Sequence, residues 1–139
     1  VNLNITAPLL LSNAVVAEAR RPDNVNIVHI GSGAGRKSYP GWSIYGASKA
    51  ALDRHAASAA NEERGVRIVS LAPGTVDTAM QEGMRRDPHF PLREHFAKIH
   101  ADGGLQNAND TALKILAYCL SDQFGREAIV DIRSIELPL

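Results

Sequence analysis

The sequence predicts an α/β fold in which helices cover a parallel sheet. Three short segments rich in β-branched residues, near residues 24–32, 66–73 and 127–133, alternate with longer helical patterns. The first two are continuously apolar, which is typical of strands buried on both faces. Strands that alternate with helices along the chain form parallel sheets. No repeat or linker divides the 139 residues, so one domain is expected.

The first half of the chain supplies two helices and a strand. Residues 1–21 are predicted to be helical, with an irregular start because Pro8 lies too far inside to begin a helix. Residues 24–32, "NVNIVHIGS", are predicted as a buried strand bounded by turn residues. The Ala-rich stretch 41–64 is predicted as a long helix that Gly65 closes. The near-helical spacing in the first helix comes from Leu3, Leu10, Ala14 and Ala17.

The second half continues the alternation. Residues 66–73 form the second predicted strand, and residues 77–104 two short helices divided by "DPHFP". Residues 109–122 are predicted as a helix that an Asn or Asp caps. Residues 127–133 form the last predicted strand. The apolar stripe of the helix before it consists of Leu113, Leu116, Ala117 and Leu120.

The composition of the chain argues against some classes of function. Fifteen basic residues balance fifteen acidic ones, so no basic surplus points to nucleic acid. No apolar run reaches the length of a membrane span, and no secretory signal opens the sequence. Cys119 is the single cysteine and cannot form an internal disulfide, which favours a reducing compartment. We therefore expect a cytoplasmic protein with a small-molecule or protein partner, and neither a nucleic-acid nor a membrane partner.

Open α/β sheets bind ligands beyond the carboxyl ends of their strands. Here those ends carry "GSGAGRKSYPG", "APGTVDTAM" and "DIRSIE". Gly31, Gly33 and Gly35 invite comparison with a phosphate-binding loop. Such a loop must run straight into a helix, and Pro40 interrupts the path. A plain Gly-rich turn is the favoured interpretation, with the Ser32 hydroxyl at the strand end as its useful group.

Tyr45 and Lys49 lie four residues apart on the predicted helix, and hence on one face. A free phenol has a pKa of about 10, and a nearby ammonium lowers it. Such a phenol can donate a proton to a carbonyl oxygen as hydride arrives, while a serine hydroxyl holds the same oxygen. The pair alone is a weak signal, because this spacing occurs often by chance. Ser32 at a strand end upstream strengthens it.

The chain resembles the short-chain dehydrogenase/reductase family. The matching pieces are "NITAPLLLSNAV", "IVHIGSGAG", "YGASKAAL" and "VRIVSLAPGTVDTAM", in the order and at the separations of the family. The resemblance covers Val1 to Met80 closely and the remainder more loosely. It implies a Rossmann-type doubly wound parallel sheet. No family-type βαβ cofactor unit precedes Val1, so residues 1–139 are expected to be the carboxyl-terminal part of a single reductase domain.

The resemblance implies a role for each matching residue. Tyr45 corresponds to the acid/base, and Lys49 to the lysine that lowers the phenol pKa and holds the nicotinamide ribose. Ser32 corresponds to the serine that orients the substrate carbonyl. Asn4 matches the asparagine of the proton relay, with Asn2 as the competing choice and a helix cap as the plain alternative for both. The turn that contacts the nicotinamide carboxamide corresponds to Pro73, Gly74, Val76 and Thr78, although a simple strand-ending turn would also place Pro73 and Gly74 there.

A narrower resemblance is to the sepiapterin reductase and benzil reductase-like branch. It rests on "PGWSIYGASKAALD", "PGTVDTAMQEGMR", "ADGGLQNANDTALKIL" and "FGREAIVDIR". This branch implies NADP(H) rather than NAD(H), and Trp42 at the substrate. It also implies that Asp131 recognises the amino group of a pterin. A charged residue that merely ends a strand explains Asp131 equally well.

The histidines offer little chemistry. His29 stands where many family members carry Asn, and a histidine inside an apolar strand is more often a hydrogen-bonded core residue than a catalyst. His89, His95 and His100 form no helical i, i+4 pair, so no metal site is expected.

The resemblance implies an NADPH-dependent carbonyl reductase that acts on a ketone, a dicarbonyl or a pterin side chain. It also implies a homodimer or homotetramer formed through helices 1–21 and 41–64. Because the cofactor unit is absent, residues 1–139 alone are expected to be inactive. The alternative is a catalytically silent fragment that acts as a dimerisation or binding module.

Overall fold

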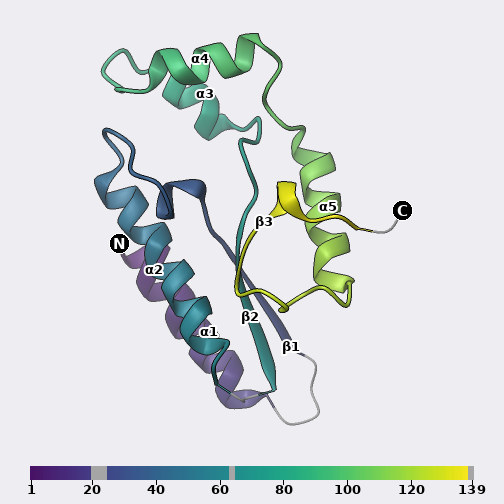
Figure 1. Ribbon diagram of the computed structural model, residues 1–139. Coiled ribbons are helices and arrows are strands. Elements are labelled where there is room, and N and C mark those ends of the chain that lie inside the picture. Colours follow the sequence, from purple (N-terminus) through teal and green to yellow (C-terminus); the bar gives the residue numbers. More distant parts are fainter. Residues whose placement is uncertain (20–24, 63–64, 138–139) are drawn as a thin grey trace.

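A parallel three-stranded sheet forms the centre of the molecule (Figure 1). This is a computed structural model that describes residues 1–19, 25–62 and 65–137. The strands are β1 (Val25–Ile30), β2 (Val66–Ala72) and β3 (Ile129–Asp131), in the order β1-β2-β3. Val25 pairs with Val66, and Ala72 pairs with Asp131. The carboxyl ends of all three strands therefore meet at one edge.

Helices lie on both sides of the sheet (Figure 1). Helices α1 and α2 lie on one side and α5 on the other, while α3 and α4 stand beyond the carboxyl ends of the strands. The predicted class, a parallel sheet with helices on both faces, is thus confirmed. The helices are α1 (Ala7–Glu18), α2 (Ser43–Ala59), α3 (Ala79–Arg86), α4 (Arg93–Ala101) and α5 (Ala108–Leu120).

The main core lies between the sheet and α5. Strand β2 is central and its last five residues are all buried, whereas β1 is more exposed because it pairs only with β2 among the described residues. Burial of this apolar surface is the main stabilising term of the fold. The fully packed cluster consists of Val69, Leu71, Tyr118, Phe124, Val130 and Ile132.

Several element ends differ from the sequence prediction. Helix α2 ends at Ala59, where the amides of Asn61 and Glu62 bond three residues back and tighten the last turn. Gly65 does have a left-handed φ of 71°, but it follows this turn and does not close the helix. The last strand spans only Ile129–Asp131, because a 3-10 turn at Ile132–Ser134 follows it at once.

The remaining differences lie in the helices at the two ends of the chain. A π-helical turn at Asn2–Thr6 precedes α1, in line with the irregular start expected near Pro8. Arg20 and Arg21, predicted as part of that helix, lie outside the described residues. Asn107 caps α5, and not Asn109 or Asp110, because its side chain accepts both of their amide hydrogens.

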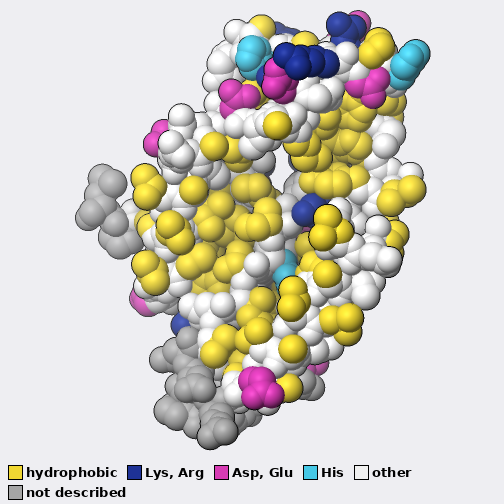
Figure 2. Space-filling view, turned by 180° about the vertical axis from the view of Figure 1, so that it is seen from behind, with side chains coloured by type: hydrophobic (Ala, Val, Ile, Leu, Met, Phe, Trp, Pro, Cys, Tyr) yellow, Lys and Arg dark blue, Asp and Glu magenta, His cyan; other side chains and the backbone are white. Residues whose placement is uncertain are grey.

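Two predicted apolar stripes do not face the core. Leu113, Leu116 and Leu120 of α5 are 65%, 58% and 88% exposed, and the helix packs instead through Tyr118 and its neighbours. On the opposite side, Leu3 and Leu10 of the amino-terminal segment are also exposed. Figure 2 shows the side of β1 and α1, where hydrophobic side chains gather around a hollow.

His29 is a buried core residue of β1, as the sequence favoured. Its Nε2 lies 3.0 Å from Nδ1 of His55 on α2, and the side chain is 5% exposed. Burial, and next the nearby His55 and Lys49, lower the pKa of His29 to about 4. His29 therefore stays neutral inside the fold at neutral pH.

We predict that His29 makes the protein less stable in mild acid. Between pH 6.5 and pH 4 an unfolded histidine binds a proton that buried His29 does not. The free energy of unfolding should therefore fall as the pH drops through this window, by on the order of 3 kcal/mol, and level off outside it. His29→Gln should flatten this slope in urea denaturation. His89→Gln, at an exposed position, serves as the control, and equal slopes for wild type and His29→Gln would contradict the prediction.

Candidate active site

One pocket at the carboxyl edge of the sheet gathers most of the predicted site residues. Its cavity volume is about 390 Å³, within the range of small-molecule sites. The end of β1, helix α2, the loop after β2, the α3–α4 segment and the end of β3 all contribute to its wall. The predicted residues that line it are Ser32, Trp42, Tyr45, Lys49, Pro73, Gly74, Val76, Thr78 and Asp131.

Tyr45 and Lys49 project from one face of α2 into this pocket. The Lys49 Nζ lies 5.7 Å from the centre of the Tyr45 ring, and it donates a 2.7 Å hydrogen bond to the carbonyl oxygen of Ile30. Burial lowers the pKa of the Lys49 ammonium. The cation is therefore held between the end of β1 and the phenol, where it acts on both the tyrosine and any ligand in the pocket.

Ser32 lies directly after β1 and caps a 3-10 turn, Gly33–Gly35. Its Oγ accepts a hydrogen bond of 3.1 Å from the amide of Ala34. This turn packs against the backbone of α2, since a Cβ on Gly46 would lie 2.8 Å from the Ala34 oxygen. Gly33–Gly35 is thus a packed turn that does not lead into a helix, which supports the plain-turn interpretation over a phosphate loop.

The loop after β2 forms the opposite wall. Gly74 has φ of 81°, a left-handed conformation that glycine adopts without strain. A side chain there would also collide with the Nε2 of Gln106. Gln106 holds the loop through backbone bonds of 2.9 Å with Thr75 and Asp77. Pro73 and Gly74 therefore end the strand and line the pocket at the same time.

Trp42 joins helix α2 to the α3–α4 segment. Its ring centre lies 5.3 Å from that of Tyr45, in an edge-on arrangement. On its other sides it meets Phe90 at 5.8 Å and Phe96 at 5.6 Å. Tyr39 completes the cluster at 5.4 Å. This aromatic wall borders the pocket next to the tyrosine.

Asp131 ends β3 and lies at the pocket wall, but its carboxylate already has a partner. Arg133 donates to it from Nε at 2.9 Å and from Nη2 at 2.6 Å, and the Arg133 amide donates at 3.0 Å. The side-chain hydrogen bonds from Arg133 hold the pKa of Asp131 below its usual range. The acid is therefore ionised and paired before any ligand binds.

Asn4 lies near the pair on α2 but outside the main pocket. It borders one hollow with Lys49 and another with Tyr45. Thr6 occupies the N-cap position of α1, so neither Asn4 nor Asn2 caps that helix. Asn4 is half-buried whereas Asn2 is exposed, which favours Asn4 of the two candidates.

Sequence reasoning missed other groups in the pocket. Gln81 is 8% exposed, and its Oε1 has no hydrogen-bond partner among the described residues. Arg133 and Tyr39 also line the wall. Arg133 stands two residues after Asp131, and residues at this spacing in a strand point to the same face of the sheet. No pattern in the neighbouring sequence indicates a role for Gln81.

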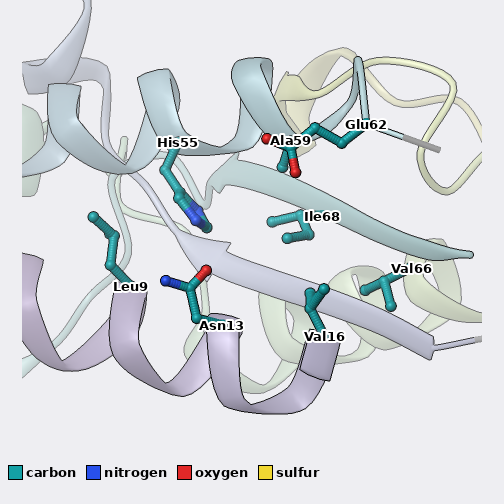
Figure 3. A pocket seen from close by; sticks show the side chains of 8 residues that line it. All are labelled: Leu9, Asn13, Val16, His55, Ala59, Glu62, Val66 and Ile68. Carbon is teal, nitrogen blue, oxygen red and sulfur yellow. The ribbon is translucent and has the colours of Figure 1, made fainter. Parts of the chain in front are cut away.

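A further hollow shares no lining residue with the main pocket. Helices α1 and α2 and strand β2 enclose about 190 Å³, and Figure 3 shows His55 and Asn13 pointing into it among aliphatic side chains.

Among the described residues, no group of three or more His, Cys, Asp or Glu side chains comes together to hold a metal ion. None of the described helices is long and apolar enough to cross a membrane.

Comparison with known proteins agrees with this geometry. The family described as short chain dehydrogenase matches residues 1–89. The chain belongs to that family. It is similar to sepiapterin reductase of Mus musculus, with 34% identity over 93% of this chain and 51% of the mouse protein. It is also similar to a benzil reductase of Bacillus subtilis (strain 168), with 35% identity over 83% of this chain and 50% of that protein. Both relatives bear the names of the branch that the sequence resembles.

Among solved structures, the chain is similar to the KRED1-Pglu enzyme, with a TM-score of 0.77 and 27% identity. That match covers 91% of this chain and 55% of the enzyme. The chain thus spans about half the length of the relatives it matches.

We predict that residues 1–139, produced alone, self-associate and bind NADPH negligibly. Strand β1 has an unpaired edge among the described residues, and such edges pair with other chains. The resemblance assigns contacts in this pocket only to the nicotinamide end of a dinucleotide. Light scattering should show aggregates or oligomers, and NADPH titration should show no saturable fluorescence change. Micromolar binding with turnover would show that these residues suffice.

Proposed function

We propose that the protein carrying this chain is an NADP(H)-dependent carbonyl reductase. The supporting observation is that Ser32, Tyr45 and Lys49 line one pocket at the carboxyl edge of the sheet. These side chains provide a hydrogen-bond donor, an acid and a cation around a space large enough for a small carbonyl compound. The preference for NADP(H) over NAD(H) rests on the resemblance to the sepiapterin and benzil reductase branch.

The residues present fit the nicotinamide end of the cofactor. Lys49 places a half-buried cation at the pocket, and Gly74 lets the backbone approach closely where a Cβ would collide with its neighbours. Lys49, Tyr45 and the loop containing Pro73, Gly74, Val76 and Thr78 would hold this end. When bound, the reduced nicotinamide supplies the hydride.

Each side chain then has a task that follows from its chemistry. Ser32 donates a hydrogen bond that orients the substrate carbonyl oxygen. Tyr45 gives its proton to that oxygen as negative charge develops there. Lys49 favours the phenolate that remains, because opposite charges attract across a partly desolvated site. Asn4, next to both residues of α2, is placed to bring a proton back to the tyrosine through water.

The aromatic wall suggests a substrate with a flat ring. Trp42 presents its ring beside Tyr45, with Phe90 and Phe96 behind it. Such rings stack on planar ligands at about 0.5–1.5 kcal/mol beyond simple burial. An aryl ketone, an aryl diketone or a pterin side-chain carbonyl fits this description.

We further propose that copies of the protein associate through helices 1–21 and 41–64. Leu10 and Leu11 of α1 and Ile44 of α2 are 62%, 67% and 71% exposed. Exposed apolar groups of this size are often covered by a partner. The same surface supports the alternative, a catalytically silent module whose only role is to associate.

We predict that Tyr45→Phe abolishes carbonyl reduction with little change in fold or cofactor affinity. Removing the proton donor should lower kcat by about 10²–10⁴, measured with NADPH and benzil. Lys49→Ala should reduce both kcat and NADPH affinity, because the lysine has two tasks. Tyr118→Phe is the matched control, since that hydroxyl is in the core and has no partner among the described residues. If Tyr45→Phe keeps more than about half of the wild-type kcat, the acid has been misassigned.

We predict that Asp131 discriminates among substrates by whether they carry an amino group. For a carbonyl substrate with an amino group, such as sepiapterin, Asp131→Asn should raise KM by about tenfold, because a charge-assisted hydrogen bond contributes roughly 1.5–3 kcal/mol. Benzil should be unaffected. Arg133→Met should do the opposite for the amino substrate, since it frees the carboxylate from its present partner. Equal effects of Asp131→Asn on both substrates would make it a structural residue.

A further inference from the structure

A polar network with two buried members lies behind the pocket, and none of its members was singled out by sequence. Asp53 of α2 is 6% exposed and Ser70 of β2 is fully buried. The Ser70 hydroxyl donates a 2.6 Å hydrogen bond to Oδ1 of Asp53. Arg36 reaches the same carboxylate with Nε at 3.0 Å from Oδ2 and Nη2 at 3.4 Å from Oδ1.

Arg36 also reaches the sheet itself. Its Nη2 lies 3.1 Å from the carbonyl oxygen of Val130 and 3.5 Å from that of Ser70. One guanidinium therefore bridges helix α2 and strands β2 and β3. The planar fork of arginine suits such a junction, because its donors point in fixed directions.

The network connects the two segments that carry the proposed catalytic residues, the Ser32 turn and helix α2. Arg36 immediately follows the turn that Ser32 begins, and its amide bonds to the Gly33 carbonyl at 3.0 Å. On α2, Asp53 lies four residues after Lys49, and Lys49 lies four residues after Tyr45. Residues spaced by four share a helix face. Pairing Arg36 with Asp53 therefore fixes the Ser32 turn against the face that carries the tyrosine and the lysine.

We propose that Arg36 and Asp53 are positioning residues that set the place of the Ser32 hydroxyl relative to Tyr45. They touch neither substrate nor cofactor, and this role rests on the proposed reductase function. Removing Arg36 releases the turn and leaves the buried Asp53 carboxylate, one helical turn from Lys49, with the Ser70 hydroxyl but without its cationic partner. Misplacing a catalytic group by about 1 Å can lower a rate by around 10²-fold.

The test compares Arg36→Met, Asp53→Asn and the double variant in the complete protein. We expect each single variant to lower kcat about 10- to 100-fold with KM for benzil changed less than about threefold, measured well below the melting temperature. The double variant should be no worse than either single one, because the two side chains act as a unit. Arg36→Lys, which keeps the charge but loses the fork, should restore kcat only in part. Arg126→Met is the control, since its ion pair with Asp122 is exposed.

A second measurement does not depend on turnover. The amides of Gly35 and Arg36 bond to the Ser32 and Gly33 carbonyls at 3.0 Å each, so hydrogen exchange reports whether the turn is held. Arg36→Met should speed exchange at both amides at least tenfold, while amides within α2 stay protected. Ser70→Ala, which keeps the ion pair, offers a milder perturbation if Arg36→Met does not fold.

The outcomes separate the two proposals. A folded Arg36→Met with wild-type kcat and wild-type exchange overturns the positioning role, and so do additive losses in the double variant. Wild-type protein that reduces neither benzil nor sepiapterin counts against the reductase function, and exchange at Gly35 and Arg36 then decides the positioning role by itself. Faster exchange in Arg36→Met supports that role, and unchanged exchange overturns it.

Discussion

The site depends on a direct contact between the turn after β1 and the backbone of α2. A Cβ on Gly46 would lie 2.8 Å from the Ala34 oxygen, and one on Gly35 would lie 2.8 Å from the Lys49 carbonyl carbon. Both distances are shorter than packed side chains tolerate, so glycine is required on each side. Because the two backbones touch, Ser32 at the start of the turn is held against α2 and lines the same pocket as Tyr45. Any larger residue at these positions would push the turn and the helix apart.

The order of the strands determines where the other walls of the pocket lie. Strand β2 is central, so its end places the Pro73–Gly74 loop between the Ser32 turn on one side and Asp131 on the other. Parallel pairing brings all three ends to the same edge. Helices α3 and α4 then cover that edge, and the contact of Trp42 with Phe96 links them to α2. The pocket is thus assembled from segments far apart in sequence without a long ordered loop.

Local patterns predicted those features whose cause is local. The helix face shared by Tyr45 and Lys49 follows from spacing, and the buried strands follow from continuous apolar runs. The stripe containing Leu113 and Leu116 also follows from spacing, but although amphipathic helices usually bury such stripes, α5 packs through other residues. The pairing of Arg36 with Asp53 escaped notice because it forms only after the sheet, the turn and the helix have come together. Tertiary contacts of this kind leave no periodic signal in the sequence.

The pairing of Asp131 with Arg133 has a consequence for the substrates that the proposed reductase would prefer. A cationic ligand must compete with a bidentate arginine for the carboxylate, and a charge-assisted bond of this kind is worth roughly 1.5–3 kcal/mol. A neutral aromatic carbonyl compound meets no such competition. It gains contact with the ring of Trp42 and leaves the ion pair in place. In the proposed reductase, a flat, uncharged carbonyl substrate would bind without disturbing this pair, whereas an amino group on the ligand would gain the carboxylate as Arg133 moves aside.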